Sequence, residues 1–307
     1  MIYDLIIIGG GPAGSGAGVY AARKKLKTLF LTKDFGGQSS VSTDIQNWIG
    51  TVSISGTKLG EDLKKHVLAY AGDSLELKEG EAVQSIEKTG DIFQVKTNSE
   101  VFETKSVLVA TGADRRKLNI PGAKEFENKG ITYCASCDGP LFSDMDVVVI
   151  GGGNAGFETA AQLLAYTKSV TLLHRGPEFK ADQITVEKVL KNPKIKAIRN
   201  ADILEVKGDN FVKSLTYKDT EAGTTHEIET SGIFVEIGLI PATSFLGNLL
   251  ELTEYKQIVV NPKDQKTSVL GIWAAGDCTS NLYHQNNIAT GDAIRALEDI
   301  YIHLHAR

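Results

Sequence analysis

The sequence predicts an α/β fold with two Rossmann-like nucleotide-binding domains, each doubly wound and three-layered, the second of which is inserted into the first. Two observations favour this class. A short apolar run followed by a glycine-rich turn and a helical stretch occurs twice, and each copy closes with a strand that runs into another glycine. The 307 residues are enough for roughly two domains of ordinary size. A content of 42% hydrophobic and 23% charged residues is typical of a globular chain.

The first copy begins near the N-terminal end. Leu5–Ile8 is an apolar run suited to a buried parallel strand, Gly9–Gly14 is a glycine-rich turn, and Ala13–Arg23 is an alanine-rich helical stretch. Between a strand and a helix, such glycines turn the chain tightly, admit a pyrophosphate and present the helix N-terminus to it. The predicted dinucleotide contacts of this turn are Gly9, Gly11, Pro12, Ala13 and Gly14.

The second copy repeats this order. The strand is Asp146–Ile150, the turn is Gly151–Gly156, and the helix runs from Phe157 to Tyr166. One such turn is a weak signal, but two in the same context predict two dinucleotide sites, against the alternative of two turns with only a structural use. The predicted contacts are Gly151, Gly153, Asn154, Ala155 and Gly156.

The closing strands indicate the domain boundaries. Ser106–Gly112 closes the first copy and Gly232–Gly238 closes the second. Val269–Asp277 is then a late strand that runs into a glycine turn and a carboxylate, and it returns the chain to the first domain. We therefore expect one domain over residues 1–114 and 244–307, interrupted by another over residues 115–243.

Charge and apolar-run length argue against several other classes. The formal net charge is −5, whereas nucleic-acid-binding surfaces are basic, so no nucleic-acid partner is expected. No apolar stretch reaches the roughly 18 residues that a membrane-spanning helix needs. The first residues lack the basic region of a signal peptide, and three cysteines do not make the disulfide framework of a secreted protein. We expect no membrane partner and a cytoplasmic location.

Two of the three cysteines lie in the stretch YCASCDG at residues 133–139. The alternatives are a redox pair, half of a zinc site and two unreactive core cysteines. A structural zinc site needs four ligands, and only Cys278 and six scattered histidines remain, so no metal site is expected. Cys134 and Cys137 are spaced so that a disulfide can form across one turn. The sequence favours the redox pair, and Cys278 is expected to be a small buried side chain.

Over essentially the whole chain, the ordered set of motifs resembles the low-molecular-weight thioredoxin reductases, with the flavoprotein subunit of alkyl hydroperoxide reductase close behind. The resemblance implies FAD in the interrupted first domain, a nicotinamide nucleotide in the inserted domain, and a homodimer. The motifs that carry it are Gly9–Gly14, Gly36-Gly37-Gln38, Asn47-Trp48, Ala110-Thr111-Gly112, Cys134–Asp138, Gly151–Gly156 and Gly276-Asp277.

The resemblance also implies roles for single residues. Cys137 would be the sulfur next to the flavin, and Cys134 the sulfur that attacks the disulfide of the protein substrate. Asp138 would donate or accept a proton, and Asp277 would accept a hydrogen bond from a ribitol hydroxyl; for both aspartates the alternative is a capping role. The other implied flavin contacts are Gly37, Gln38, Asn47, Thr111, Gly112, Gly276, Gln285, Asn286 and Asn287.

The choice of pyridine nucleotide depends on the stretch after the second strand of the inserted domain. Family members that use NADPH carry His-Arg-Arg and a further arginine there, whereas this chain has His174, Arg175, Gly176 and, further on, Lys180. Relatives that use NADH have an acidic residue at the position of His174. The positive charge favours NADPH over NADH, and a different electron donor is a third option. The implied nucleotide contacts are His174, Arg175, Lys180 and Gly238.

Three functions remain in view. The first is an FAD-dependent thioredoxin reductase that uses NADPH and acts on thioredoxin or a glutaredoxin-like carrier. The second is an NADH-dependent flavoprotein of the alkyl-hydroperoxide-reductase type that feeds a peroxiredoxin through a separate relay protein; Gly156 and the stretch Lys180–Gln183 resemble that branch. The third is a flavin-binding protein whose dithiol senses redox state.

Overall fold

The computed structural model describes residues 1–42 and 44–306 and divides into two compact units. Unit 1 comprises Met1–Asp114 and Ile240–Arg307, and unit 2 comprises Arg115–Leu239. The chain returns to unit 1 at Ile240, whereas the sequence analysis placed this return at residue 244. The two crossing segments pair with each other as the short strands β7 (Ala113–Arg115) and β16 (Leu239–Pro241).

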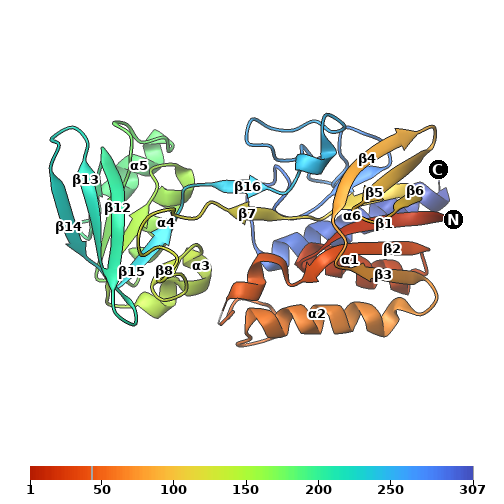
Figure 1. Cartoon of the computed structure of the whole chain (residues 1–307), viewed down its shortest axis with the longest axis horizontal. Coiled ribbons are helices and arrows are strands. Elements are labelled where there is room, and N and C mark those ends of the chain that lie inside the picture. Colours follow the sequence, from red (N-terminus) through yellow and green to blue (C-terminus); the bar gives the residue numbers. More distant parts are fainter. Residues whose placement is uncertain (43, 307) are drawn as a thin grey trace. The chain divides into compact units, whose positions relative to one another are not determined.

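Unit 1 is built on a sheet in the order β3-β2-β1-β6-β5-β4, in which β6 also pairs with β17 (Figure 1). Neighbouring pairs among β1, β2, β3, β6 and β17 are parallel, whereas β4, β5 and β6 form an antiparallel meander. The strands are β1 (Ile2–Gly10), β2 (Thr28–Phe35), β3 (Leu75–Glu79), β4 (Val83–Thr89), β5 (Ile92–Thr97), β6 (Val101–Val109) and β17 (Ile272–Ala274).

The sheet of unit 1 carries a hydrophobic core on each face. Because successive side chains of a strand alternate between faces, Leu5 and Ile7 pack against the helices, whereas Ile6 and Ile8 pack against β4, β5 and the segment 246–260. Figure 1 shows α2 and β4 on opposite sides of β1–β3. The helices are α1 (Pro12–Arg23), α2 (Gly56–Ala71) and α6 (Asn286–Ala306), with short 3₁₀ turns η1 (Gly37–Val41) and η3 (Ser244–Leu246).

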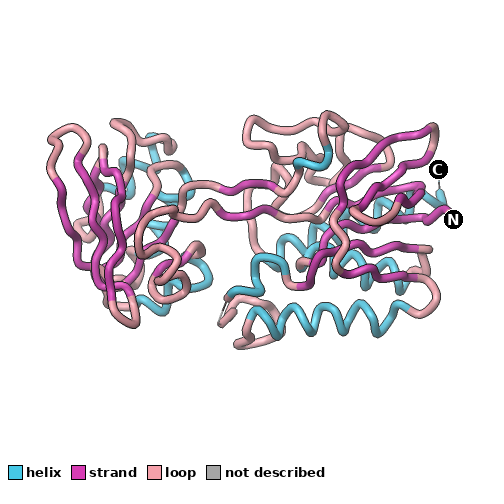
Figure 2. Tube along the Cα trace, in the orientation of Figure 1, coloured by secondary structure: helices cyan, strands magenta, loops and turns pink. Residues whose placement is uncertain are grey.

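Unit 2 contains a parallel sheet in the order β11-β10-β9-β15-β8 and an antiparallel sheet in the order β12-β13-β14 (Figure 2). The strands are β8 (Ile131–Thr132), β9 (Asp146–Ile150), β10 (Ser169–Leu173), β11 (Ile195–Ile198), β12 (Ala201–Gly208), β13 (Val212–Asp219), β14 (Thr225–Glu229) and β15 (Gly232–Val235). The helices are α3 (Ala135–Asp138), α4 (Asn154–Leu163) and α5 (Gln183–Leu190), with the 3₁₀ turn η2 (Gly139–Phe142).

The parallel sheet of unit 2 also packs on both faces. Val147 and Val149 of β9 contact the layer of α3, α4 and α5, and Val148 and Ile150 contact the antiparallel sheet. Each face is covered, which is why these strands are continuous apolar runs in the sequence. β9 is therefore central in its unit, as β1 is in unit 1.

The predicted α/β class, with two three-layered units built on parallel sheets, is confirmed. The layers differ from a doubly wound arrangement in one respect: in each unit one face of the parallel sheet is covered by helices and the other mainly by antiparallel strands. Apolar alternation cannot distinguish these two kinds of cover, because either one buries the same strand residues. Across residues 1–42 and 44–306, no helix is long and apolar enough to cross a membrane.

Candidate functional site

The first glycine turn lies where the strand order of unit 1 reverses. β2 and β3 follow β1 on one side and β6 lies on the other. Gly9 has φ +116°, and a Cβ there would come within 2.2 Å of the Ala110 carbonyl oxygen; a Cβ on Gly14 would come within 1.8 Å of the Gly9 oxygen. These two glycines are therefore needed by the fold itself.

Gly11 has a different reason to be glycine. A Cβ added there would meet nothing within 4 Å, so no protein atom excludes a side chain. Gly11 is also the N-cap of α1 and is followed by Pro12 at the first helical positions. Open space at the N-terminus of a helix that is preceded by a tight turn suits a pyrophosphate. The turn thus fits the dinucleotide that the sequence analysis placed there.

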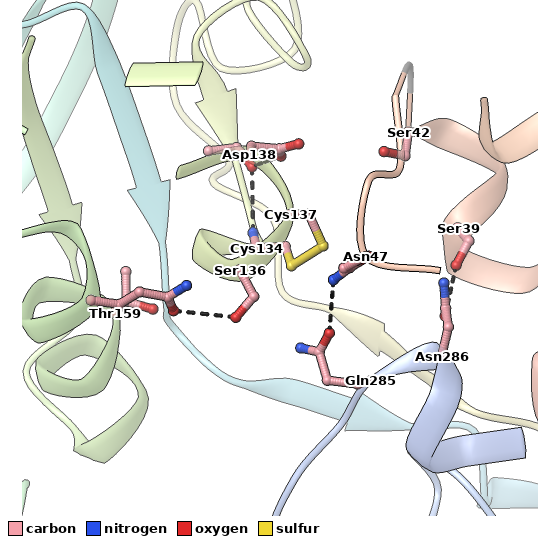
Figure 3. The surroundings of a disulfide bond; sticks show 12 residues. Ser39, Ser42, Asn47, Cys134, Ser136, Cys137, Asp138, Thr159, Gln285 and Asn286 are labelled. Carbon is pink, nitrogen blue, oxygen red and sulfur yellow. Dashed lines mark hydrogen bonds between the residues drawn. A yellow bond between two sulfur atoms is a disulfide. The ribbon is translucent and has the colours of Figure 1, made fainter. Parts of the chain in front are cut away.

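Two segments of unit 1 that are far apart in the sequence meet through side-chain hydrogen bonds. Asn47 Nδ2 donates to Gln285 Oε1 at 3.1 Å, and Asn287 Nδ2 donates to the Asn47 carbonyl at 2.7 Å (Figure 3). Ser39 Oγ donates to Asn286 Oδ1 at 2.9 Å. The structure therefore brings together four residues that the family resemblance singled out as flavin contacts, Asn47 and Gln285–Asn287, and adds Ser39.

The remaining candidates of unit 1 lie on the same side of the sheet. A Cβ on Gly37 would lie 3.5 Å from Cα of Gly11, which places η1, and with it Gln38, beside the first glycine turn. A Cβ on Gly276 would lie 3.3 Å from the Cβ atoms of Ala13 and Ala289. Gly276 and the adjacent Asp277 are thereby held against the first turns of α1 and α6.

Thr111 and Gly112 follow β6 at the same edge. The Thr111 hydroxyl donates to the Ala242 carbonyl at 2.8 Å, and the Gly112 carbonyl accepts from the Ala242 amide at 3.0 Å. Both residues therefore anchor the segment on which the chain returns to unit 1. Gly112 has φ +69°, a conformation that favours glycine.

Cys278 is fully buried in unit 1. Its Sγ donates to the carbonyl oxygens of Ala275 at 3.4 Å and Val109 at 3.6 Å. Burial raises the pKa of this thiol to about 11, and the negative charge of Asp277 adds to the increase. A thiol that is both buried and protonated is a poor nucleophile.

We therefore expect slow alkylation of Cys278. After reduction with dithiothreitol, native protein should react rapidly with iodoacetamide at Cys134 and Cys137 only, and Cys278 should react only after unfolding. Mass spectrometry of the alkylated peptides checks this. Rapid modification of Cys278 in the native protein would show that the thiol is reached from solvent.

The second glycine turn repeats the geometry of the first in unit 2. Gly151 has φ +135°, and a Cβ there would come within 2.1 Å of the Glu236 carbonyl oxygen. A Cβ on Gly156 would come within 2.0 Å of the Gly151 oxygen, whereas one on Gly153 would meet nothing within 4 Å. Gly153 is the N-cap of α4. Again two glycines are needed by the fold, and one leaves space at a helix N-terminus.

Asn154 and Ala155 are the first residues of α4. Asn154 Oδ1 accepts a hydrogen bond from the Asp182 amide at 2.7 Å, and the Asp182 side chain in turn caps α5 by accepting from Ile184 and Thr185. The side chain of Asn154 thus connects two helix N-termini. Its backbone N–H group remains part of the first turn of α4.

His174, Arg175 and Lys180 lie after β10, the neighbour of β9. The His174 ring lies against Gly152, where a Cβ would come within 2.5 Å of the ring, and its Nε2 is 2.8 Å from the Glu178 carbonyl. Burial lowers the pKa of His174, and the charges of Lys180 and Arg175 lower it further. Near neutral pH the positive charge of this stretch therefore comes from Arg175 and Lys180, not from His174.

The backbone fixes this stretch next to the second glycine turn. The Lys180 amide donates to the Gly152 carbonyl at 2.7 Å, and the Gly176 carbonyl accepts from Asn200 at 3.1 Å. Arg175 and Lys180 are only partly buried or exposed, so their charged groups reach solvent. Two such cations at the end of the second strand are suited to an anionic group on an adenosine ribose.

Cys134 and Cys137 form a disulfide on the short helix α3, directly after β8 (Figure 3). Their Cα atoms are 5.3 Å apart. The Cys134 carbonyl accepts from the amides of Cys137 at 3.2 Å and Asp138 at 3.0 Å, and these bonds close the turn. Ser136 Oγ donates to Gln162 Oε1 of α4 at 3.2 Å, which ties the disulfide turn to the helix of the second glycine motif.

Asp138 accepts a hydrogen bond from the hydroxyl of Thr132, the last residue of β8. The same hydroxyl oxygen accepts from the Cys134 amide at 3.4 Å. The carboxyl group is thereby held on the disulfide turn. Among the described residues, no group of three or more histidine, cysteine, aspartate or glutamate side chains could hold a metal ion.

The family described as pyridine nucleotide-disulphide oxidoreductase matches residues 3–293. The chain belongs to this family. Membership implies a flavin, a pyridine nucleotide and oxidoreductase chemistry. The two glycine turns and the disulfide described above are the parts of the chain that this chemistry needs.

Known members of the family match almost the whole chain. "Thioredoxin reductase from Giardia duodenalis" is 33% identical, with a TM-score of 0.93, and the match covers 100% of this chain and 99% of that one. The alkyl hydroperoxide reductase flavoprotein of Escherichia coli is 42% identical over 96% of this chain, and "NADH dehydrogenase" of Bacillus subtilis is 40% identical over 96%. The chain spans 57% of the length of these two curated relatives. The resemblance to the thioredoxin reductases is confirmed.

The sequence analysis missed residues that act through side chains rather than motifs. Thr132 and Ser39 are single hydroxyls without a recognisable spacing. Glu236 is a different case: it precedes Gly238 as Ala110 precedes Gly112, so a comparison of the two closing strands shows a carboxyl where the first copy has a methyl.

Proposed function

We propose that the protein is an FAD-dependent disulfide reductase that passes electrons from NADPH, through FAD and the Cys134–Cys137 disulfide, to thioredoxin or a thioredoxin-like or glutaredoxin-like carrier. The observation that carries the proposal is the disulfide itself. It lies on the turn after β8, in the same unit as one of two dinucleotide turns. The matched solved structures named thioredoxin reductase support the choice of protein substrate.

The residues of unit 1 fit FAD. The space at Gly11 and the N-terminus of α1 would take the pyrophosphate, and Asp277 would accept a hydrogen bond from a ribitol hydroxyl. Asn47, Gln285 and the residues hydrogen-bonded to them would contact the ring system. When bound, the flavin supplies a two-electron carrier between a nicotinamide and a disulfide.

The dithiol chemistry belongs to unit 2. In the reduced protein, Cys134 Sγ attacks a sulfur of the substrate disulfide, so that a bond forms between Cys134 and the substrate while the other substrate sulfur leaves as a thiolate. Cys137 Sγ then attacks Cys134 Sγ. This step re-forms the Cys134–Cys137 disulfide and releases the second substrate thiolate, so two electrons have moved to the substrate.

Asp138 is the proposed proton carrier for these thiolates, because its carboxyl group is held on the same turn by Thr132. We expect Asp138→Asn to lower disulfide turnover by about 100-fold, as general acid–base catalysis commonly contributes. One limb of the pH profile should disappear, while flavin reduction by the nucleotide is retained. Turnover equal to that of the unchanged protein at every pH would leave Asp138 a capping role only.

NADPH is the proposed nucleotide because Arg175 and Lys180 place two positive charges after β10, and no carboxylate stands at that strand end. Anaerobic flavin bleaching by NADPH and NADH at equal concentration, followed by stopped-flow absorbance, measures the preference. We expect faster bleaching by NADPH, and Arg175→Ala should reduce this advantage. Faster bleaching by NADH would reverse the assignment, and bleaching by neither would indicate another electron donor.

A second candidate function is transfer of electrons to a peroxiredoxin through a separate relay protein. Identity of 42% to the alkyl hydroperoxide reductase flavoprotein of Escherichia coli favours it. It ranks second because that relative is matched over only 57% of its length, whereas the thioredoxin reductase structures are matched over 99% of theirs. Steady-state reduction of a thioredoxin and of a relay domain by the same preparation compares the two.

We also propose a homodimer, as the family resemblance implies. Light scattering coupled to size-exclusion chromatography should give about twice the chain mass of 33.1 kDa. A mass equal to that of one chain would contradict the dimer without affecting the proposed chemistry.

A further inference from the structure

Glu236 lies at the point in unit 2 where the strand order reverses. β10 and β11 lie on one side of β9, and β15 and β8 lie on the other. Dinucleotides bind in doubly wound sheets across this point, outside the carboxyl ends of the strands. Gly151 is the first residue after β9, and Glu236 is the first residue after β15; the Glu236 amide donates to the Ile150 carbonyl at 2.8 Å.

The direction of the nucleotide follows from its two fixed ends. The second glycine turn takes the pyrophosphate, and the end of β10, with Arg175 and Lys180, takes the adenosine ribose. The nicotinamide half must then extend from β9 in the opposite direction, over β15. The first side chain that it meets after β15 is Glu236.

Unit 1 provides an internal comparison. Ala110 occupies the same place after β6, and its amide donates to the Ile8 carbonyl at 2.8 Å, as that of Glu236 does to Ile150. A Cβ on the first glycine of each turn would strike the carbonyl oxygen of Ala110 or Glu236, respectively. The backbone is therefore equivalent in both copies, and only the copy in unit 2 places a carboxyl group at this position.

The carboxyl group of Glu236 is half-buried and is held from one side. Thr159 Oγ1 of α4 donates to Glu236 Oε1 at 2.9 Å, and among the described residues only this carboxylate oxygen has a hydrogen-bond partner. The charged groups that face it are Arg115 from β7 and Glu158 from α4. Burial raises the pKa of Glu236, whereas Arg115 and the Thr159 hydroxyl lower it and Glu158 raises it.

We propose that Glu236 recognises the nicotinamide half of the pyridine nucleotide and that its carboxylate favours the oxidised, positively charged ring over the reduced, neutral ring. This inference rests on the proposed function, because it places a pyridine nucleotide on the second glycine turn. A fixed negative charge stabilises a nearby cation more in a site with little water than at the surface. Glu236 is thus a recognition residue that favours the charge formed when the nicotinamide gives up its hydride.

The pH dependence has a definite sign. Below its raised pKa, Glu236 is protonated and neutral, and the two ring forms should bind with a similar ratio of affinities at all lower pH values. As pH rises through that pKa, the carboxylate forms and the oxidised nucleotide gains affinity relative to the reduced one. Coupling of about one pKa unit corresponds to a change of about tenfold in this ratio.

Calorimetric titration of the oxidised, FAD-loaded protein tests this from about pH 5 to about pH 9. The probes are NADP⁺ and its 1,4,5,6-tetrahydro analogue, whose ring is uncharged and cannot transfer a hydride; NAD⁺ and its analogue replace them if they bind more tightly. Each pair shares the same adenosine and phosphates, so the titration of His174 or of the nucleotide phosphates cancels in the ratio of the two dissociation constants.

We expect the ratio to change by about tenfold in the unchanged protein and to stay flat in Glu236→Gln, which keeps the acceptor for Thr159. Glu229→Gln, the same chemical change on exposed β14, should behave like the unchanged protein. Thr159→Val should move the midpoint to higher pH, because the hydroxyl bond that lowers the pKa of Glu236 is lost.

Two results would overturn the inference: a flat ratio in the unchanged protein, or a pH-dependent ratio that survives in Glu236→Gln. In both cases the nucleotide still binds, so the proposed function stands. If neither nucleotide pair bound to the unchanged protein at any pH, the nicotinamide step of the proposed function would fail together with this inference.

Discussion

Replacing Cys137 with serine should abolish disulfide turnover while the nucleotide still reduces the flavin. Cys134 and Cys137 form the disulfide of unit 2, and loss of one sulfur removes the only dithiol that the described geometry provides. Loss of an essential nucleophile commonly costs at least about 1,000-fold in turnover. Steady-state reduction of thioredoxin and stopped-flow bleaching of the flavin, measured on the same preparation, separate the two steps.

Cys134→Ser is the matched variant. Both serine variants should lose turnover, but only Cys137→Ser keeps the thiol that is proposed to attack the substrate. We therefore expect Cys137→Ser to form a lasting mixed disulfide with an activated thioredoxin, and Cys134→Ser to form none. A mixed disulfide with Cys134→Ser instead would exchange the two roles. Normal turnover in Cys137→Ser would leave the dithiol a sensing role at most.

Gly151→Ala should abolish reduction by the nucleotide and destabilise unit 2. The position has φ +135°, and the new methyl group would come within 2.1 Å of the Glu236 carbonyl oxygen. A non-glycine residue in such a conformation, together with a backbone clash, costs about 2–4 kcal/mol in the free energy of unfolding. Thermal unfolding and anaerobic bleaching by NADPH measure the two effects.

Gly153→Ala is the control for this change. Its added Cβ meets no protein atom within 4 Å, so we expect the melting temperature to stay close to that of the unchanged protein. Because the methyl group would occupy the space next to the N-terminus of α4, nucleotide affinity should fall by at least about tenfold, or about 1.4 kcal/mol. Equal stability of the two variants would contradict the assignment of Gly151 as a residue that the fold requires.

Much of this fold could be predicted because its strongest signals are local. The apolar runs at Leu5–Ile8 and Asp146–Ile150 became the central strands β1 and β9, and the turns after them begin α1 and α4. Each turn contains glycines that only a backbone without a side chain can satisfy, and such positions are readable from spacing alone.

Other features depend on contacts between distant residues. Nothing in the sequence around Asn47 indicates that its side chain bonds to Gln285, 238 positions away. The antiparallel sheet that covers one face of unit 2 buries the same β9 residues that a helical layer would bury, so alternation could not identify it. Asn154 was assigned to the nucleotide from its motif, but its side chain accepts a bond from Asp182, a partner that only the fold brings near.

Glu236 lies between these two cases. The strand that leads to it was expected, and its equivalence with Ala110 can be seen in the two closing stretches. Its importance depends on the reversal of strand order between β9 and β15, which no local pattern records. Topology therefore carries the information that residue spacing lacks.

Anaerobic titration of the FAD-loaded protein with NADPH tests the central claim most directly, because it counts the electrons that the protein accepts. If electrons pass from the nucleotide through FAD to the Cys134–Cys137 disulfide, the oxidised protein should consume about two equivalents, one for each two-electron acceptor. Cys137→Ser should consume about one. Consumption of about one equivalent by the unchanged protein, with its disulfide intact at the end of the titration, would contradict the account.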